Sequence, residues 1–522
     1  MSALMPTSNT NDMNPYVKDS LIKFHNVESD LYSSNKKFGI FSIEMAQTTM
    51  TQKDQELNST NDMSGSMSDI CQDGRSKMQH LQVTLENITR LLSANAEQIA
   101  VNLEITGFDD SIVQVLEPTK ITNDSEQLQQ IINKVKKELY SRGSTNIHLA
   151  LQDATSRLEQ KPIASQKSLI FMTDGNITNG PTDIETLIHS VPKDSHNYFI
   201  GFGADHDFAL LQQLSSINLG SYYYVDKIEN AGLVFGEIIH SILYTALRNV
   251  TIQVTNGEIY DFQTNQWLTE IRVPNLCGEA KKNYHVRSEI PYEFELTLTG
   301  LSETGTISMS ELALPELEDI EKGIKEVVDL SKYIYRQYVL ELLHISAKIA
   351  SSSSSSTSRS EDRERKTNHI EEMKNMRKKI EAYSALQDSQ EDKDFLKQLQ
   401  DDLYISEKTL LSENALLYTV ARQTSQGREC SYNVTDLKRQ NAFAHEYDED
   451  YEIEDAPISR AYTSDTQQKI MRGVSAGAEI SCTENEASWD YLDDECSKEN
   501  NTKNISQIQR QCGGIKRQYA IN

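Results

Sequence analysis

Near the start of the chain, a carboxylate and two hydroxyls stand at alternate positions. Asp62, Ser64 and Ser66 belong to the stretch from Asn61 to Met67, and a second carboxylate, Asp174, precedes a glycine later in the chain. Hydroxyl and carboxylate oxygens are ligands for hard cations such as Mg²⁺ rather than for zinc or copper. Binding of a divalent cation is therefore the chemistry open to these residues, provided that the fold brings them together.

Asp174 follows directly after an apolar strand. Residues 169–172 read Leu-Ile-Phe-Met, a run typical of a central parallel strand that is covered on both faces. Strand-like and amphipathic helical runs alternate through this part of the chain, which predicts a doubly wound, Rossmann-like α/β domain. Thr145 stands in a loop just after Gly143, a residue type suited to ending a helix. Ligands of such folds bind beyond the carboxyl ends of the strands, where we expect Asp62, Thr145 and Asp174 to converge.

The hydrophobic pattern changes along the chain and predicts a multi-domain protein. Alternating residues predict a small antiparallel β-domain after the α/β domain, and apolar residues at helical spacing then predict a helical hairpin. The predicted divisions are a flexible arm at 1–35, the α/β domain at 36–248, the β-domain at 249–315, the hairpin at 316–427 with a Ser-rich linker at 351–366, and an acidic, largely disordered tail at 428–522. Residues 36–53 are also candidates for pairing with the β-domain. The hairpin either offers a coiled-coil surface to a partner or packs on itself and on the β-domain.

Composition excludes several classes of function. The formal net charge of -27 argues against binding to nucleic-acid phosphates, which needs clustered Lys and Arg. The six cysteines lack zinc-site spacing, and we expect them to be reduced thiols. Residues 1–16 lack the pattern of a signal peptide, and the most apolar helical run, 232–247, is too short to span a bilayer. We therefore expect a soluble, cytoplasmic protein.

The segment from about residue 54 to 247 resembles a von Willebrand factor A-type domain with a metal-ion-dependent adhesion site. The resemblance is carried by Asp62-Met-Ser-Gly-Ser66, by the loop around Thr145 and by Ile170-Phe-Met-Thr-Asp-Gly175. The stretches Gly107-Phe-Asp-Asp110 and Ile200-Gly-Phe-Gly-Ala-Asp205 are also typical of the family.

The resemblance implies a set of metal ligands. Ser64, Ser66 and Thr145 would bind the cation through hydroxyls, and Asp62 and Asp174 would act directly or through water. The implied cation is Mg²⁺, with Mn²⁺ as a substitute, and neutral hydroxyl ligands would leave its charge undercompensated. The implied partner is a protein that offers an Asp or Glu carboxylate. The implied activity is metal-dependent protein–protein interaction and not catalysis.

The strand before Asp62 departs from the family pattern. It reads Glu56-Leu-Asn-Ser-Thr-Asn61, where a buried apolar run is expected. A central strand of this polarity must satisfy its side chains inside the sheet. We therefore expect either a distorted strand or a domain of lowered stability.

Two other functions fit parts of the sequence. One is a scaffold that acts through its helical hairpin and has a vestigial metal site. The other is a metal-dependent hydrolase, but no phosphate-binding Gly-rich loop accompanies the acidic residues. The triplet Asp205-His-Asp207 precedes an amphipathic helix, so we expect Asp207 to be its N-cap rather than a metal ligand.

Overall fold

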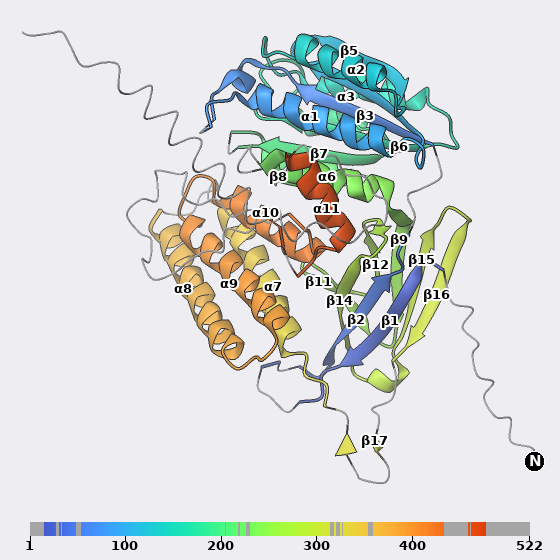
Figure 1. Cartoon of the computed structure of the whole chain (residues 1–522). Coiled ribbons are helices and arrows are strands. Elements are labelled where there is room, and N and C mark those ends of the chain that lie inside the picture. Colours follow the sequence, from blue (N-terminus) through green and yellow to red (C-terminus); the bar gives the residue numbers. More distant parts are fainter. Residues whose placement is uncertain are drawn as a thin grey trace, which may run out of the picture. The chain divides into compact units, whose positions relative to one another are not determined.

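The computed structural model describes residues 15–476 except for some internal segments (Figure 1). The segments not described are 28–30, 33, 49–53, 72, 204, 218–219, 226–229, 314–317, 320–323, 326, 353–358, 433–457 and 460. The acidic block at 445–455 and residues 477–522 of the predicted tail thus lie outside the described residues. Within the described ranges, no helix has the length and apolar character needed to cross a membrane.

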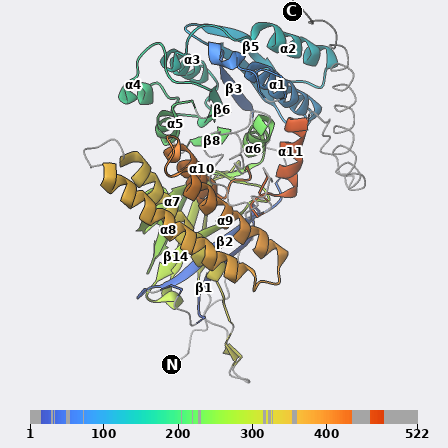
Figure 2. The ribbon, with the colours of Figure 1, turned by 90° about the vertical axis from the view of Figure 1, so that its left-hand side faces the viewer.

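A six-stranded sheet forms the centre of the α/β domain. Its strands are β3 (Gln55–Asp62), β4 (Val101–Phe108), β5 (Ile112–Lys120), β6 (Gln166–Thr173), β7 (His196–Phe202) and β8 (Ser221–Val225). Its helices are α1 (Lys77–Ala94), α2 (Ser125–Glu138), α3 (Ile147–Glu159), α4 (Ile184–His189), α5 (Phe208–Ser215) and α6 (Ala231–Leu243). The strand order is β5-β4-β3-β6-β7-β8, and all pairs are parallel except β4 with β5. Helix α1 contacts α2 and α6, whereas α4 contacts α3 and α5, and Figure 2 shows these groups on opposite sides of the sheet. The predicted doubly wound arrangement is confirmed.

Strand β3 is buried along its whole length although most of its side chains are polar. The expected distortion is wrong, because β3 pairs without a register shift with both β4 and β6. The polar side chains bind one another and the neighbouring backbone instead. Thr60 Oγ1 donates to Asn58 Oδ1 over 2.7 Å, and Asn61 Nδ2 donates to the carbonyl oxygens of Ser59 and Thr106 over 2.9 and 3.2 Å. These hydrogen bonds replace the hydration that the groups lose on burial.

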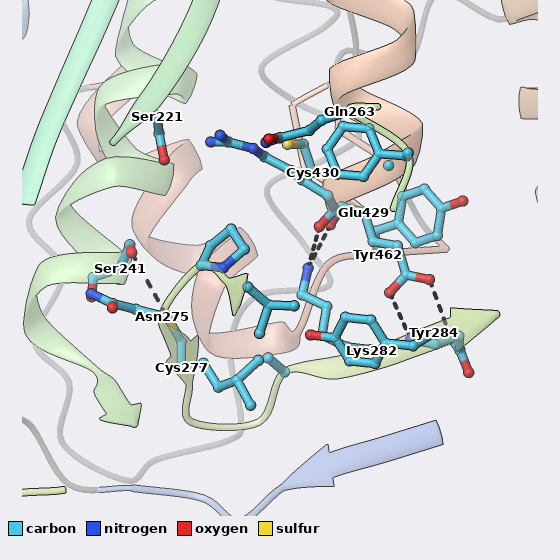
Figure 3. A pocket seen from close by; sticks show the side chains of 18 of the residues that line it. Ser221, Ser241, Gln263, Asn275, Cys277, Lys282, Tyr284, Glu429, Cys430 and Tyr462 are labelled. Carbon is cyan, nitrogen blue, oxygen red and sulfur yellow. Dashed lines mark hydrogen bonds between the residues drawn. The ribbon is translucent and has the colours of Figure 1, made fainter. Parts of the chain in front are cut away.

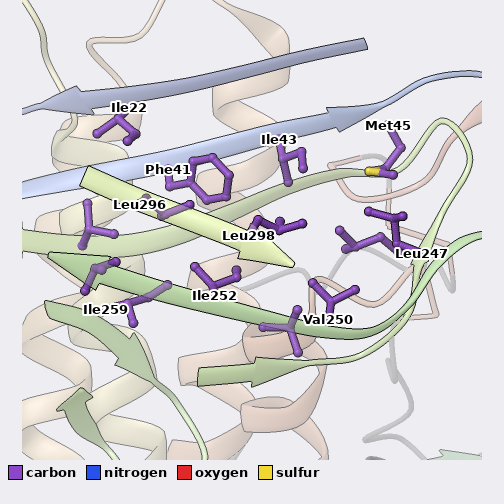
Figure 4. Close-up of a cluster of buried hydrophobic side chains, with 14 of the residues drawn as sticks. Ile22, Phe41, Ile43, Met45, Leu247, Val250, Ile252, Ile259, Leu296 and Leu298 are labelled. Atoms are coloured by element: carbon purple, nitrogen blue, oxygen red, sulfur yellow. The ribbon is translucent and has the colours of Figure 1, made fainter. Parts of the chain in front are cut away.

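Two antiparallel sheets form a β-sandwich. Their strands are β1 (Val17–Phe24), β2 (Lys37–Met45), β9 (Thr245–Thr255), β10 (Glu258–Asp261), β11 (Gln266–Leu268), β12 (Glu270–Val273), β13 (Leu276–Cys277), β14 (Lys281–Ser288), β15 (Glu295–Leu301) and β16 (Thr306–Leu312), with a 3-10 turn at Pro291–Glu293. One sheet has the order β1-β2-β14-β10-β11, and the other has β12-β9-β15-β16 with β13 paired to β9. Ile43 of the first sheet and Ile252 and Leu298 of the second share one apolar core (Figure 4).

The sandwich takes two strands from the start of the chain. Strand β2 pairs with β14, which places residues 37–45 in the sandwich and not in the α/β sheet. Strand β1 pairs with β2, so the predicted flexible arm is wrong for residues 17–24. Residues 1–14 of that arm lie outside the described residues.

Four helices occupy most of the stretch predicted as a helical hairpin. They are α7 (Ser331–Ser352), α8 (Arg359–Ser384), α9 (Gln390–Thr409) and α10 (Ala415–Arg428), after a short strand pair formed by β17 (Glu318–Asp319) and β18 (Ile324–Lys325). The predicted hairpin of two helical runs is wrong in its number of helices, because Ser389 caps a further helix by accepting a hydrogen bond from Asp392 N over 3.3 Å. Val339, Met373 and Leu399 belong to an apolar core that α7, α8 and α9 share.

Helix α11 (Asp465–Ala476) lies within the stretch predicted to be largely disordered, so that prediction is wrong for these residues. It packs along α6, where glycines let the two backbones approach closely. A Cβ on Gly236 would stand only 2.5 Å from Cα of Met471. Asn87 Nδ2 of α1 donates to the carbonyl oxygen of Val474 over 2.8 Å. A segment far along the chain thus covers part of the α/β domain.

Helix α6 is also linked to the chain that follows α10. The Glu237 carboxylate accepts hydrogen bonds from two successive backbone amides, the closer being Tyr432 N at 2.8 Å. Burial raises the pKa of Glu237, and these hydrogen bonds offset only part of the rise. Glu237 lines a cavity of about 170 Å³ between the α/β domain, the sandwich and the helices (Figure 3). At this cavity Lys282 Nζ donates to the carbonyl oxygens of Arg428 and Glu429, each over 2.8 Å.

Replacing Gly236 by alanine should loosen α11. Glycine-to-alanine replacement inside a helix normally stabilises it by about 1 kcal/mol. Here the added methyl group overpacks the α6–α11 contact, and we expect a net loss of about 1–3 kcal/mol instead. Hydrogen exchange should accelerate in residues 465–476, and the melting temperature should fall. Gly65→Ala is the control, because its Cβ would meet only Gly143 O at 3.8 Å. Unchanged exchange in α11 would contradict this account of the contact.

Candidate metal centre

The predicted ligand residues lie in loops at one edge of the α/β sheet. Asp62 is the last residue of β3, and Ser64 and Ser66 follow it around the 3-10 turn η1 (Gly65–Ser68). Asp174 comes directly after β6. Because β3 and β6 are parallel neighbours, both carboxylates stand at the same edge of the sheet. Thr145 precedes α3 in the loop that faces them.

Four of the five residues form one hydrogen-bonded network. Ser66 Oγ donates to Asp174 Oδ1 over 2.7 Å, and the hydroxyl oxygens of Ser64 and Ser66 are 3.0 Å apart. The backbone N–H of Ser64 donates to Asp62 Oδ1 over 2.7 Å. The other oxygen of Asp62 accepts a hydrogen bond from Thr173 Oγ1. The structure thus brings Asp62, Ser64, Ser66 and Asp174 together.

Thr145 stands at the rim of the same network. A Cβ on Gly175 would lie 3.7 Å from Ser66 Oγ and 3.8 Å from Thr145 Oγ1, so both hydroxyls border that glycine. The loop backbone is fixed on its far side, where Thr145 N donates to Thr178 Oγ1 over 2.8 Å. The carbonyl oxygen of Thr145 accepts a hydrogen bond from Thr178 N over 3.1 Å. The glycine leaves a small space between the Ser66 and Thr145 hydroxyls.

Asp109 holds the Thr145 loop in place. Its Oδ2 accepts a hydrogen bond from Arg142 Nε over 2.6 Å, and its carbonyl oxygen accepts one from Asn146 N over 3.0 Å. Gly143 has a φ of 67°, and a Cβ there would stand 2.9 Å from Cβ of Asp109, so this turn requires glycine. Burial raises the pKa of Asp109, but hydrogen bonds from Ser111 and Arg142 outweigh it and leave the pKa below its ordinary value. Asp109 therefore stays ionised and anchors the loop.

The two carboxylates of the site have different electrostatic surroundings. Burial raises the pKa of Asp62 to about 6, although hydrogen bonds from Thr173 and Ser64 lower it in part. Asp174 is fully buried and pairs with Lys77, whose Nζ lies 2.7 Å from Asp174 Oδ2. A divalent cation beside Asp62 would favour its ionised form.

The donor set fits a hard cation. It consists of two carboxylates and three hydroxyls, which are the oxygen ligands that Mg²⁺ and Mn²⁺ accept. Ser64 Oγ and Ser66 Oγ lie 3.0 Å apart, so these two oxygens of the donor set are close together. No cluster of three or more His, Cys, Asp or Glu side chains suited to a metal occurs in the part of the chain that the structure describes. Any metal held here would depend on the hydroxyls.

The sequence does not predict three contributors to this site. Thr173 stands at the end of β6, which puts its hydroxyl beside Asp62. Lys77 has one local signal, its place directly after the helix cap Ser76. Asp109 belongs to a stretch typical of the family, but its contacts across the loop do not follow from the local sequence.

The Asp205-His-Asp207 triplet has the structural role that the sequence predicted. Asp207 caps α5 by accepting a hydrogen bond from Leu210 N over 3.0 Å. The ring of His206 is buried, with Nδ1 2.7 Å from Gly203 O and Nε2 2.6 Å from the Tyr222 hydroxyl. Both ring nitrogens of His206 are thus engaged within the fold, and the prediction of Asp207 as a cap is confirmed.

The chain is similar to several known proteins. Residues 61–237 match the family model of the von Willebrand factor type A domain. A search of the curated proteins found no match. Among solved structures, the chain is similar to the ArnB paralog VWA2 from Sulfolobus acidocaldarius at 14% identity, with a TM-score of 0.45 and coverage of 78% of this chain and 98% of that one.

Two further solved structures are also similar to parts of the chain. A von Willebrand factor type A protein from Catenulispora acidiphila is 13% identical, with a TM-score of 0.43, and the match covers 65% of this chain and 83% of that one. Proximal thread matrix protein 1 from the mussel byssus, described with a zinc-occupied MIDAS motif, is 12% identical with a TM-score of 0.31, and the match covers 40% of this chain and 51% of that one. Residues 61–237 are thus similar to a von Willebrand factor type A domain by the family-model match, and most of the six-stranded sheet described above lies within them.

Proposed function

We propose that this protein binds a partner protein through a divalent cation held at the edge of its α/β sheet. The observation that carries the proposal is the network of Asp62, Ser64, Ser66 and Asp174, whose oxygens already lie at hydrogen-bonding distances. Von Willebrand factor type A domains are in general interaction modules, which supports binding rather than catalysis. We place this activity in the cytoplasm, the compartment expected from the sequence.

The roles of the residues follow from their positions. Ser64, Ser66 and Thr145 would offer neutral hydroxyl oxygens to Mg²⁺ or Mn²⁺, and Asp62 and Asp174 would act directly or through water. A cation in this surrounding retains Lewis acidity and supplies a binding position for an Asp or Glu carboxylate of the partner. Asp109 and Arg142 would keep the Thr145 hydroxyl in place while the partner docks. The chain itself thus orients the ligands and shields the buried carboxylates from water.

The helical region is a weaker candidate for the binding surface. Helices α7, α8 and α9 bury their apolar side chains in a shared core rather than leaving a coiled-coil seam for a partner. Leu330 and Ile334, at the start of α7, pack against Phe38 and Ile40 of β2. These contacts favour a helical region that supports the sandwich. A scaffold function predicts that capture of a partner does not depend on the cation.

Mg²⁺ or Mn²⁺ should raise the melting temperature of the full chain. Binding to the folded state alone adds about 2.7 kcal/mol of stability at a hundredfold excess over the dissociation constant. Asp174→Ala should abolish the rise, and Asp205→Ala, which removes an exposed carboxylate from a nearby loop, should retain it. Differential scanning calorimetry with and without metal checks this. An equal rise in wild type and in Asp174→Ala would show that the metal binds elsewhere.

Capture of a protein partner should depend on the cation. We expect a partner retained from cell extract in Mg²⁺ to be released by chelator and to be lost with Ser64→Ala. Ser68→Ala is the matched control, because that exposed hydroxyl of the same turn contacts only Gly65 O, over 2.7 Å. Mass spectrometry of the paired eluates identifies what differs. If the partner is still captured in the presence of chelator and by Ser64→Ala, the scaffold function is favoured. Hydrolysis of a phosphate ester that is lost in Asp62→Ala would instead favour a hydrolase.

A further inference from the structure

Lys77 is the first residue of α1 and directs its ammonium group into the candidate metal centre. Its Nζ lies 2.7 Å from Asp174 Oδ2 and 3.3 Å from Asp69 Oδ2. The Asp174 side chain is 0% exposed and that of Lys77 18%, whereas that of Asp69 is 66% exposed. Water screens the contact with Asp69 but hardly reaches the one with Asp174, which is therefore the stronger ion pair.

The lysine is held at this place by the start of the helix. Ser76 caps α1 in a capping box with Gln79, in which each side chain binds the other residue's backbone N–H. A positive charge in the first turn interacts unfavourably with the helix dipole, so Lys77 does not stabilise α1 by its charge. The Lys77 side chain is cationic at neutral pH, as a lysine ammonium group ordinarily is.

Lys77 completes the hydrogen bonding of the Asp174 carboxylate. Asp174 uses one oxygen for Ser66 and the other for Lys77. Asp62 uses one oxygen for the Ser64 amide and the other for Thr173. Both buried carboxylates are thus satisfied by the chain alone. An incoming divalent cation would meet a like charge that already neutralises Asp174.

We propose that Lys77 is a tethered competitor of the divalent cation, which occupies Asp174 in the metal-free site and must be displaced for the cation to bind. This inference rests on the proposed metal-dependent function. The Lys77 charge would then lower the affinity of the site for the cation. The displaced ammonium would remain at the rim of the site, where an acidic partner would stabilise it.

Removing the charge of Lys77 should tighten metal binding. We expect Mn²⁺ to bind the full-length Lys77→Met and Lys77→Gln variants at least tenfold more tightly than wild type, measured by isothermal titration calorimetry and by the loss of the free Mn²⁺ paramagnetic resonance signal. Lys77→Gln keeps a hydrogen-bond donor for Asp174 and guards against a folding defect in Lys77→Met. Lys77→Arg keeps the charge and should bind as weakly as wild type. Lys136→Met is the control, because Lys136 of α2 pairs with a different carboxylate. Its Nζ lies 2.6 Å from Glu86 Oε2 of α1.

The metal-free proteins provide a second readout. Without metal, Lys77→Met should melt below wild type, because Asp174 loses its buried partner, and the rise in melting temperature on adding Mn²⁺ should be larger than in wild type. If Lys77→Met and Lys77→Gln bind Mn²⁺ as weakly as wild type or more weakly, Lys77 does not compete with the cation. If Asp174→Ala still abolishes the binding seen in wild type, the proposed metal site is retained. Absence of Mn²⁺ binding in wild type and in both Lys77 variants would overturn the metal site and the competitor together.

Discussion

A buried carboxylate, that of Asp62, governs the geometry of this edge of the sheet. A charge removed from water is unfavourable unless hydrogen bonds replace its hydration. Asp62 obtains them from the Ser64 amide and the Thr173 hydroxyl. The first contact fixes the turn that presents Ser64 and Ser66, and the second ties the end of β3 to the end of β6. The arrangement of the hydroxyls thus follows from the need to solvate one carboxylate, whether or not an ion is bound.

The sequence is sufficient to place the candidate site, but not to predict how its charged and polar groups are paired. Asp62 and Asp174 each follow a strand, and parallel strands bring such positions to one edge, so their convergence follows from local pattern alone. The distortion expected of the polar strand β3 does not occur, because side chains of Asn58, Thr60 and Asn61 bind one another or the backbone of β3 and β4. No local pattern encodes these contacts, and the side-chain nitrogen of Asn58 is buried without a partner among the described residues. The role of Lys77 depends on the direction of one side chain, and a sequence does not give that.

The remaining errors concern pairings between distant segments. Strand β1 joins the sandwich through β2, which in turn pairs with β14 more than 200 residues away, so its order comes from partners that are remote in sequence. Helix α11 was hidden in a stretch rich in polar residues, although Ile470, Met471 and Val474 have helical spacing and are fully buried. The one readable signal was on its partner helix, where Gly232 and Gly236 stand one turn apart.

The contact between α6 and α11 changes how the chain divides into parts. The match to the type A domain ends at residue 237, inside α6, yet α6 is covered by a helix that begins at residue 465. In topological terms, the β9–β16 part of the sandwich and the four helices α7–α10 are an insertion between two helices that pack as neighbours. A segment cut out at the family boundaries would bare the glycine-lined groove of α6, where no side chain shields the backbone. The stretch that matches the family model and the set of elements that pack together are therefore different parts of this chain.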